Sequence, residues 1–218
     1  ATYGKWAPPT HHLENVLRFF LNKMNYNFKI NIKREGFFPK GGALIEVSTG
    51  KTNLKSINIL EKGKIREIKG ISIASSSIKN KKVAERQTEK ASKLIQKHFN
   101  LEPKIETKYV NTICPGSGLQ LWIETENSII SGNSLGELGK TSEKVAEEAY
   151  NNLIFEYKNS AIDSRTADQL LPYLALTSKG KIKTSKITNH IKTNCNVIEK
   201  FLPVKFEIKD NLIECRKL

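Results

Sequence analysis

The residues best suited to chemistry lie near the end of the chain, in the stretch Thr188-Asn189-His190-Ile191-Lys192-Thr193-Asn194. His190 stands in a polar loop, and the apolar run that follows is typical of a short helix capped by Thr193 or Asn194. A helix N-terminus has unpaired N–H groups and a partial positive charge, so it can hold a phosphate. A histidine beside a phosphate can act as a nucleophile or proton carrier. On these residues alone, a surface-loop histidine near a helix cap is the simpler interpretation.

A second group of polar residues precedes the apolar run Leu170–Leu176: Asp163, Arg165, Asp168 and Gln169. Polar groups that enter a buried segment need partners, so this group suggests the edge of a site. The simpler interpretation is a helix N-terminus with Asp163 or Ser164 as its cap.

Two glycine-containing segments invite comparison with phosphate loops. Gly136-Glu137-Leu138-Gly139-Lys140-Thr141 has Ser134 where the pattern needs its first glycine, so we expect a hairpin loop leading to a capped helix. Pro39-Lys40-Gly41-Gly42 could bring a lysine and backbone N–H groups to a phosphate. A turn whose glycines adopt positive φ is the favoured interpretation.

The histidines and cysteines give no pattern of metal ligands. His11 and His12 fall in the first turn of the first expected helix, His98 follows a basic helix face, and no carboxylate or cysteine stands at a ligand spacing from them. We therefore expect no dedicated metal site from this chain alone. The three cysteines are far apart and odd in number, which indicates neither a zinc site nor a disulfide framework: Cys114, Cys195 and Cys215. A cytoplasmic location, in a reducing compartment, is the simplest fit.

The composition is that of a globular protein with a strong basic excess. The chain has 218 residues, 38% of them hydrophobic, and a formal net charge of +14. No run of 18 apolar residues occurs, so we expect no membrane span. Residues 51–100 hold 13 Lys or Arg against 4 Glu, a field that favours a polyanion such as nucleic acid, although a solvated lysine-rich surface explains it equally well. Because the chain begins with Ala1 and enters apparent structure at once, we expect a fragment or a processed chain.

The periodicity of apolar residues predicts the elements that position these candidates. Helices are expected over residues 10–22, 83–99, 142–158 and 161–176, besides the short helix after His190. Thr10 is the expected cap of the first, the second has a heavily basic outer face, and Pro172 is a difficulty for the fourth. Strands are expected over residues 28–33, 43–48, 56–60, 70–74, 104–110, 119–124, 127–131, 181–187, 204–208 and 212–216.

The order of these elements predicts two domains. Two helix–hairpin units look like repeats of one α+β module, and a basic segment interrupts them. We expect a discontinuous main domain over residues 1–65 and 161–218, with an inserted small α/β domain over residues 66–160.

Four patterns, in this order, resemble the RNA 3′-terminal phosphate cyclase family. They are Trp6-Ala7-Pro8-Pro9 ahead of a helix, Gly36-Phe37-Phe38-Pro39-Lys40-Gly41-Gly42, Ala167-Asp168-Gln169-Leu170 with Leu174-Ala175-Leu176, and His190-Ile191-Lys192-Thr193-Asn194 followed by VIEKFLP. The second is similar to the family's GF(Y/F)P-x-GG turn. The resemblance covers essentially all 218 residues but only the latter two-thirds of a typical member. It implies an α+β fold: a large domain of repeated βαβαββ-like units with a small inserted α/β domain.

The resemblance also implies a ligase-class activity in RNA processing. Members use ATP and a divalent cation, Mg or Mn, to convert an RNA 3′-terminal phosphate into a 2′,3′-cyclic phosphate. The residue matching His190 attacks the α-phosphate of ATP and becomes adenylylated. AMP then passes to the RNA 3′-phosphate, and the vicinal 2′-OH displaces it. A branch of the same fold lacks the nucleophile and serves in RNA binding or ribosome assembly, and the presence of His190 favours the enzyme.

Only some of the family's site residues have a matching position in this sequence. The resemblance implies His190 as catalytic residue and the following nucleotide-binding residues: Pro8, Arg165, Thr166, Ala167, Asp168 and Gln169. Pro8 matches a proline that packs on adenine. Arg165 stands where some members have an aromatic side chain, and a guanidinium plane can also stack on a base. The family's N-terminal third, which supplies a metal-coordinating acid and arginines for the RNA phosphate, has no counterpart here. No metal ligand is assignable, and activity is expected to need that segment or a companion chain.

Overall fold

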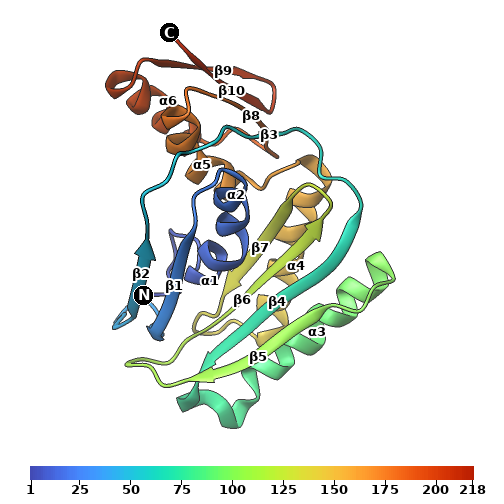
Figure 1. Ribbon diagram of the computed structural model, residues 1–218. Helices are drawn as coiled ribbons and strands as arrows, with labels where there is room; N and C mark the ends of the chain where they lie inside the picture. Colours follow the sequence, from blue (N-terminus) through green and yellow to red (C-terminus); the bar gives the residue numbers. More distant parts are fainter.

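The computed structural model describes all residues, Ala1–Leu218, as an α+β fold (Figure 1). The helical segments are α1 (Thr10–His12), a π-helical turn (Leu13–Leu17), α2 (Arg18–Lys23), a 3₁₀ segment (Ser76–Lys81), α3 (Val83–Phe99), α4 (Ser142–Asn159), α5 (Ser164–Leu176) and α6 (Asn189–Phe201). The strands are β1 (Phe28–Arg34), β2 (Leu44–Thr49), β3 (Asn58–Ile59), β4 (Ile65–Ser75), β5 (Lys104–Val110), β6 (Ser117–Thr125), β7 (Ile129–Leu135), β8 (Lys179–Lys183), β9 (Val204–Lys209) and β10 (Leu212–Lys217). Since α1, the π-helical turn and α2 are continuous, we call them together the N-terminal helix.

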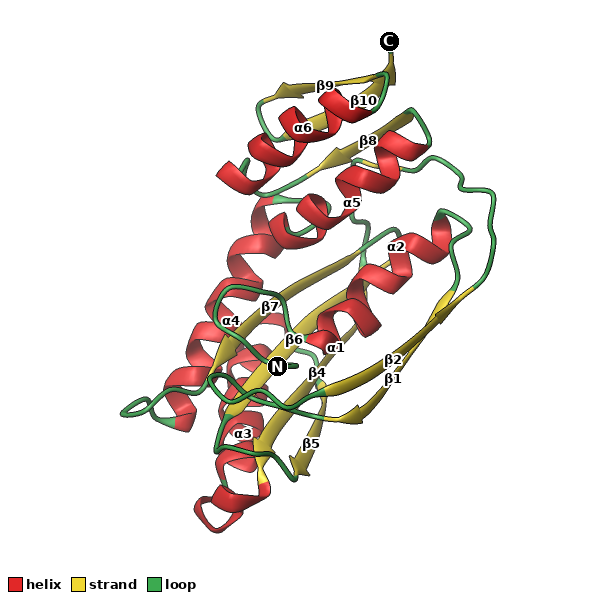
Figure 2. Cartoon of the chain, turned by 90° about the vertical axis from the view of Figure 1, so that its left-hand side faces the viewer, coloured by secondary structure: helices red, strands yellow, loops and turns green.

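The strands form three separate sheets. β1 and β2 make an antiparallel hairpin with no further strand. The C-terminal sheet has the order β3-β8-β10-β9, with β3 and β8 parallel and the other neighbours antiparallel. The third sheet has the order β5-β4-β6-β7, with only β4 and β5 parallel. In both views the N-terminal helix lies between the β1–β2 hairpin and this third sheet (Figures 1 and 2).

The third sheet buries both of its faces. Along β6, Leu119, Leu121 and Ile123 belong to a cluster of 10 buried residues shared with α3 and α4. Trp122 points to the other face and joins the main core together with residues of the N-terminal helix. Because successive side chains of a strand point to opposite faces of the sheet, β6 contributes residues to both hydrophobic cores. The expected limits of an inserted domain, residues 66–160, stay a prediction.

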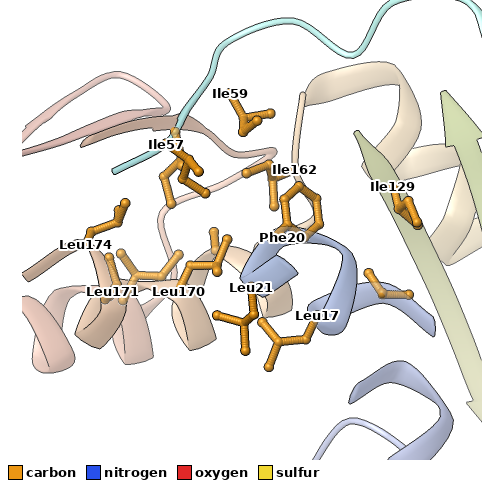
Figure 3. Packing of buried hydrophobic residues seen from close by; sticks show 14 of the residues in the cluster. Leu17, Phe20, Leu21, Ile57, Ile59, Ile129, Ile162, Leu170, Leu171 and Leu174 are labelled. Atoms are coloured by element: carbon orange, nitrogen blue, oxygen red, sulfur yellow. The ribbon is translucent and has the colours of Figure 1, made fainter. Parts of the chain in front are cut away.

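The main core holds 28 buried residues and joins the two four-stranded sheets. Figure 3 shows Leu21 of the N-terminal helix beside Leu170 of α5, and Phe20 beside Ile162. Leucines three and four residues apart lie on one side of a helix, so α5 turns a single apolar stripe to this core. The N-terminus of α5 is thereby fixed against the start of the N-terminal helix.

Most of the expected elements are confirmed to within a few residues, and so is the closing β9–β10 hairpin. The expected turn after β1 contains a cis Phe38–Pro39 bond, and Gly41 and Gly42 have φ of 65° and 78°. Thr141 caps α4 by accepting a hydrogen bond from the Lys144 N–H at 3.2 Å. The segment before it is therefore a loop into a capped helix, as expected.

Three expectations were wrong. Thr10 is not a cap, because Pro9 precedes the helix and the Thr10 N–H donates to the Thr2 carbonyl at 2.9 Å. The strand expected over residues 181–187 is β8, which ends at Lys183. His190 lies within the first turn of α6 and not in a loop, because the cap is Thr188 rather than Thr193 or Asn194.

None of the helices combines the length and the hydrophobicity that a membrane-spanning helix needs. All three cysteines are free and buried. Burial raises the pKa of the Cys195 thiol to about 12, so this side chain is a packing group of α6 and not a reactive thiolate.

Candidate active site

Two helices of the C-terminal unit begin side by side. α5 leads into β8 and α6 leads into β9, each through a short turn, so each helix runs opposite to the strand that follows it. β8 and β9 are both antiparallel to β10 and are therefore parallel to each other. Consequently α5 and α6 are parallel, and Figure 2 shows them next to each other. Both N-termini open at the carboxyl end of β8, the usual location of ligand sites in sheets with parallel strands.

One hydrogen bond ties these two helices together near their starts. The Asn194 Nδ2 of α6 donates to the Asp168 Oδ1 of α5 at 2.7 Å, and both side chains are half-buried. The amide therefore fixes one carboxylate oxygen of Asp168, and no protein hydrogen bond engages the other. Sequence reasoning missed this role for Asn194, which it considered only as a cap.

His190 occupies the second position of α6. The Thr188 hydroxyl oxygen accepts a hydrogen bond from the Ile191 N–H at 3.2 Å, which leaves the N–H groups of Asn189 and His190 without partners. The first turn of α6 contains no acidic residue, and the His190 side chain is exposed. A free N-terminal turn with a neutral cap favours an anion directly beside the imidazole.

The N-terminus of α5 is occupied by the chain's own carboxylates. Asp163 caps the helix by accepting from the Thr166 N–H at 2.8 Å, as one of the two interpretations of the sequence predicted. Glu156 accepts from the Ser164 N–H at 3.0 Å and from the Ser164 hydroxyl at 2.8 Å. Two buried carboxylates already satisfy the positive end of α5. Between the two helices, α6 is thus the one left open to a phosphate.

Behind the site, a buried ring of hydrogen bonds joins three elements. The two ring nitrogens of His12 lie 3.0 Å from the Ser131 hydroxyl and 3.3 Å from the Thr166 hydroxyl. Both hydroxyls also lie within 3.1 Å of the Asp163 carboxylate. Burial, and next the charge of Arg165, lower the pKa of His12 to about 3, while burial raises the pKa of Asp163. A neutral His12 therefore links α5 to β7 and the N-terminal helix.

The residues expected to bind a nucleotide divide into exposed and buried groups. Arg165 is exposed at the second position of α5, the position that His190 holds in α6. Gln169 lies against His12, and its buried side-chain oxygen has no hydrogen-bond partner. Thr166 and Ala167 are buried, so they support the helix and do not line an open surface.

Pro8 precedes the N-terminal helix by two residues and is half-buried. Because His12 contacts Thr166, the start of this helix lies at the N-terminus of α5. The fold thus brings the segment around Pro8 to the same end of α5 as Arg165. Since Arg165 and His190 are both exposed, the site is an open surface that a further segment or ligand can cover.

The donor set suits an anionic ligand. The free N–H groups at His190 and the Arg165 guanidinium can meet phosphates or a base. No group of three His, Cys, Asp or Glu side chains is placed to hold a metal ion.

Comparison with known proteins identifies the family of the chain. The family model described as "RNA 3'-terminal phosphate cyclase" matches residues 1–208. A protein of that name from Thermococcus gammatolerans is 38% identical over 96% of this chain and 60% of its own length. The namesakes from Pyrococcus abyssi and Methanopyrus kandleri are 37% and 32% identical, over 93% and 94% of this chain and 59% and 60% of their own lengths. This chain spans about three fifths of the length of these relatives. Because the match covers nearly the whole chain, from the N-terminal helix through α5 and α6, the chain belongs to the RNA 3′-terminal phosphate cyclase family.

Proposed function

We propose that the chain carries the nucleophile and nucleotide-binding part of an ATP-dependent RNA 3′-phosphate cyclase. The observation that supports this most is the pairing of two parallel helix N-termini. One has His190 beside free N–H groups, and the other has Arg165 at the same position with Asp168 held by Asn194. An exposed imidazole at an anion-binding helix end is what attack on a phosphate requires.

The proposed chemistry has three balanced steps. An imidazole nitrogen of His190 forms a bond to the α-phosphorus of ATP, and pyrophosphate leaves. An oxygen of the RNA 3′-phosphate then displaces the imidazole and takes over the AMP group. Finally the neighbouring 2′-OH attacks the activated 3′-phosphorus, loses its proton and expels AMP, which leaves the 2′,3′-cyclic phosphate. Adenylylation is needed because a phosphate monoester has no good leaving group of its own.

The residues around His190 have distinct roles in this proposal. The N–H groups of Asn189 and His190 bind phosphoryl oxygens on which negative charge grows, where fixed dipoles cost no reorganisation. Arg165 and Pro8 hold the base between them. Gln169, which lies against His12, supports the nucleotide pocket from behind. Asp168, oriented by Asn194, faces the ribose or the imidazole.

Covalent labelling tests this proposal. The protein is incubated with ATP labelled at the α-phosphate, and in parallel with ATP labelled at the γ-phosphate, in the presence of Mg²⁺ or Mn²⁺. We expect acid-labile label from the α-phosphate only, since the bond formed is a phosphoramidate to AMP. His190→Ala is expected to lose the label. His98→Ala, which removes an exposed histidine of α3, is the matched control and is expected to keep it.

The outcomes of this experiment distinguish a wrong assignment of the nucleophile from a requirement for the longer chain. Equal labelling of His190→Ala and the wild type would show that another residue is the nucleophile. Because the chain spans only three fifths of its relatives, the same variants are also made in a chain of the relatives' full length. Absence of label in both lengths would favour the non-catalytic RNA-binding branch of the fold.

A further inference from the structure

A cleft outside the candidate active site lies where the third sheet meets the N-terminal lead-in. It has a volume of about 620 Å³. Its walls come from the lead-in, the cis-proline turn, the start of α3, the start of β6 and the loop between β7 and α4. Its lining includes Lys5, Phe38, Lys81, Leu138 and Lys140. We call it the insert cleft. None of the residues that surround His190 lines it.

The charge of the insert cleft is positive and partly uncompensated. Three lysines line it against a single acid, Glu137, which pairs with Lys5 at 3.6 Å. Lys140 is bound by Glu148, but Lys81 forms no ion pair. An anion entering the cleft therefore meets at least one free ammonium group without displacing a partner.

This free charge stands out because most of α3 is neutralised. The expected basic face of α3 is in large part paired with α4: Arg86 binds Glu143 at 2.7 Å and Lys90 binds Glu147 at 2.8 Å. Just before α3, three lysines have no carboxylate partner: Lys79, Lys81 and Lys82. Of these, Lys81 lines the insert cleft, so the cleft holds one of the unpaired charges of this segment.

Large apolar side chains stand exposed at the rim of the cleft. Trp6 is 84% exposed, and its ring meets the edge of Phe38 with the ring centroids 5.9 Å apart. Phe38 is 46% exposed, and Leu138 on the opposite wall is fully exposed. An indole that is 84% exposed offers a stacking surface, and every nucleobase has a matching face.

The chain itself links the cleft to the nucleotide site. Lys5 lines the cleft, and Lys5 and Trp6 directly precede Pro8, which lies at the same end of α5 as Arg165. A strand that passes Pro8 on its way from the site therefore meets Trp6 at the rim of the cleft.

We propose that the insert cleft binds the single-stranded RNA upstream of the 3′ end. Its lysines contact the sugar–phosphate backbone, and one base stacks on Trp6. Aromatic stacking combined with lysines is the chemistry that recognises single strands without sequence preference. The assignment of this strand as substrate rests on the proposed function.

Tryptophan fluorescence tests the proposal directly. The chain has two tryptophans, and Trp122 is only 5% exposed. In a Trp122→Phe variant the emission comes from Trp6 alone. We expect a single-stranded RNA 12-mer to quench this emission, and expect anionic phosphatidylserine vesicles to leave it unchanged. Failure of saturating RNA to quench Trp6, or a blue shift with vesicles alone, would overturn the proposal.

Binding measurements with matched variants give a second readout. Fluorescence anisotropy of a labelled 12-mer, without ATP, is expected to show about tenfold weaker binding for Trp6→Ala and for Lys81→Glu. Phe201→Ala removes an exposed aromatic from α6, and Lys97→Glu reverses a charge at the far end of α3; both are expected to bind within twofold of the wild type. Equal binding by Trp6→Ala and Phe201→Ala would contradict the stacking role. Because the binding assay contains no ATP, its result does not depend on whether His190 becomes labelled.

Discussion

At the scale of single residues, the site depends on a buried histidine that does no chemistry. His12 reaches β7 through Ser131 and α5 through Thr166, and both hydroxyls are shared with Asp163. Every ring nitrogen and hydroxyl in this ring has a partner, which is the condition for burying polar groups without a large cost. His12 is thus a positioning residue for the start of α5.

The charge state of His12 makes a pH prediction. Burial lowers its pKa to about 3 from an ordinary value of 6.5, so the unfolded chain takes up this proton at a higher pH than the folded chain. The stability that neutral His12 contributes is complete above pH 6.5. It is lost as the pH falls from 6.5 toward 3, by about 1.4 kcal/mol per pH unit.

The variant His12→Gln isolates this effect because glutamine does not titrate. Urea unfolding at pH 7, 6 and 5 is expected to show that the stability advantage of the wild type over His12→Gln shrinks at each lower pH. Parallel profiles for the two proteins would mean that His12 is protonated inside the fold and bridged to the Asp163 carboxylate.

The sequence could predict that Asp163 caps a helix, but it could not predict the hydrogen-bonded ring around His12. Asp163 was expected as one of two caps because a short acidic residue precedes a helical pattern. His12 was only a first-turn histidine, since its partners Ser131 and Thr166 lie 119 and 154 residues away in the chain. Contacts at such separations leave no periodic signal.

At the scale of elements, α6 decides how His190 is presented. Its buried stripe includes Ile191 and Cys195, one turn apart, so the helix extends back to Asn189. The sequence holds several residues of capping type here, and Thr193 and Asn194 were expected as caps because an apolar run follows them. Ile191 was the overlooked signal: it continues the stripe by one turn and makes Thr188 the cap.

The cap makes a second prediction. Thr188→Ala removes the acceptor of the Ile191 N–H and is expected to lower the free energy of unfolding by about 1 kcal/mol. Because the first turn then frays, the initial rate of labelling at His190 should also fall. Thr188→Ser keeps the hydroxyl and is expected to retain both properties. Equal unfolding midpoints in urea for Thr188→Ala and Thr188→Ser would contradict the role of the cap.

Pro172 shows how packing overrides local preference. A proline inside a helix removes one backbone hydrogen bond and was expected to be a difficulty for α5. The helix continues from Ser164 to Leu176 nevertheless. Leu170, Leu171 and Leu174 around the proline are buried in the main core, and their burial holds the helix together.

At the scale of the whole molecule, two helix–hairpin units have different surroundings. In the C-terminal unit, α6 is followed by β9 and β10, and β10 also pairs with β8. The N-terminal helix is followed by β1 and β2 in the same order, but β2 has no second neighbour. Val47 of β2 is 61% exposed. The repeat of a helix–hairpin unit could be predicted from sequence, whereas the missing neighbour follows only from the strand order.

The comparison between these units predicts where a further strand binds. β2 corresponds to β10, whose second neighbour is β8, so we expect the free edge of β2 to accept a strand from the two fifths of the relatives that this chain does not span. An unpaired edge is a ready template for pairing. In the chain of residues 1–218, amides of β2 should exchange with deuterium at least about tenfold faster than those of β6, which is paired on both sides.

Extending the chain to the relatives' full length should slow exchange in β2 while leaving β9 unchanged. β9 is the matched control because it is also an edge strand, pairing only with β10, but in a sheet of four strands rather than two. If β2 exchanges equally fast in both lengths, the two units are not equivalent, and the added segment binds elsewhere. If β2 becomes protected, the added segment completes the unit that also supplies the N-terminal helix and Pro8 to the nucleotide site. Labelling at His190 should then rise in the same chain that protects β2.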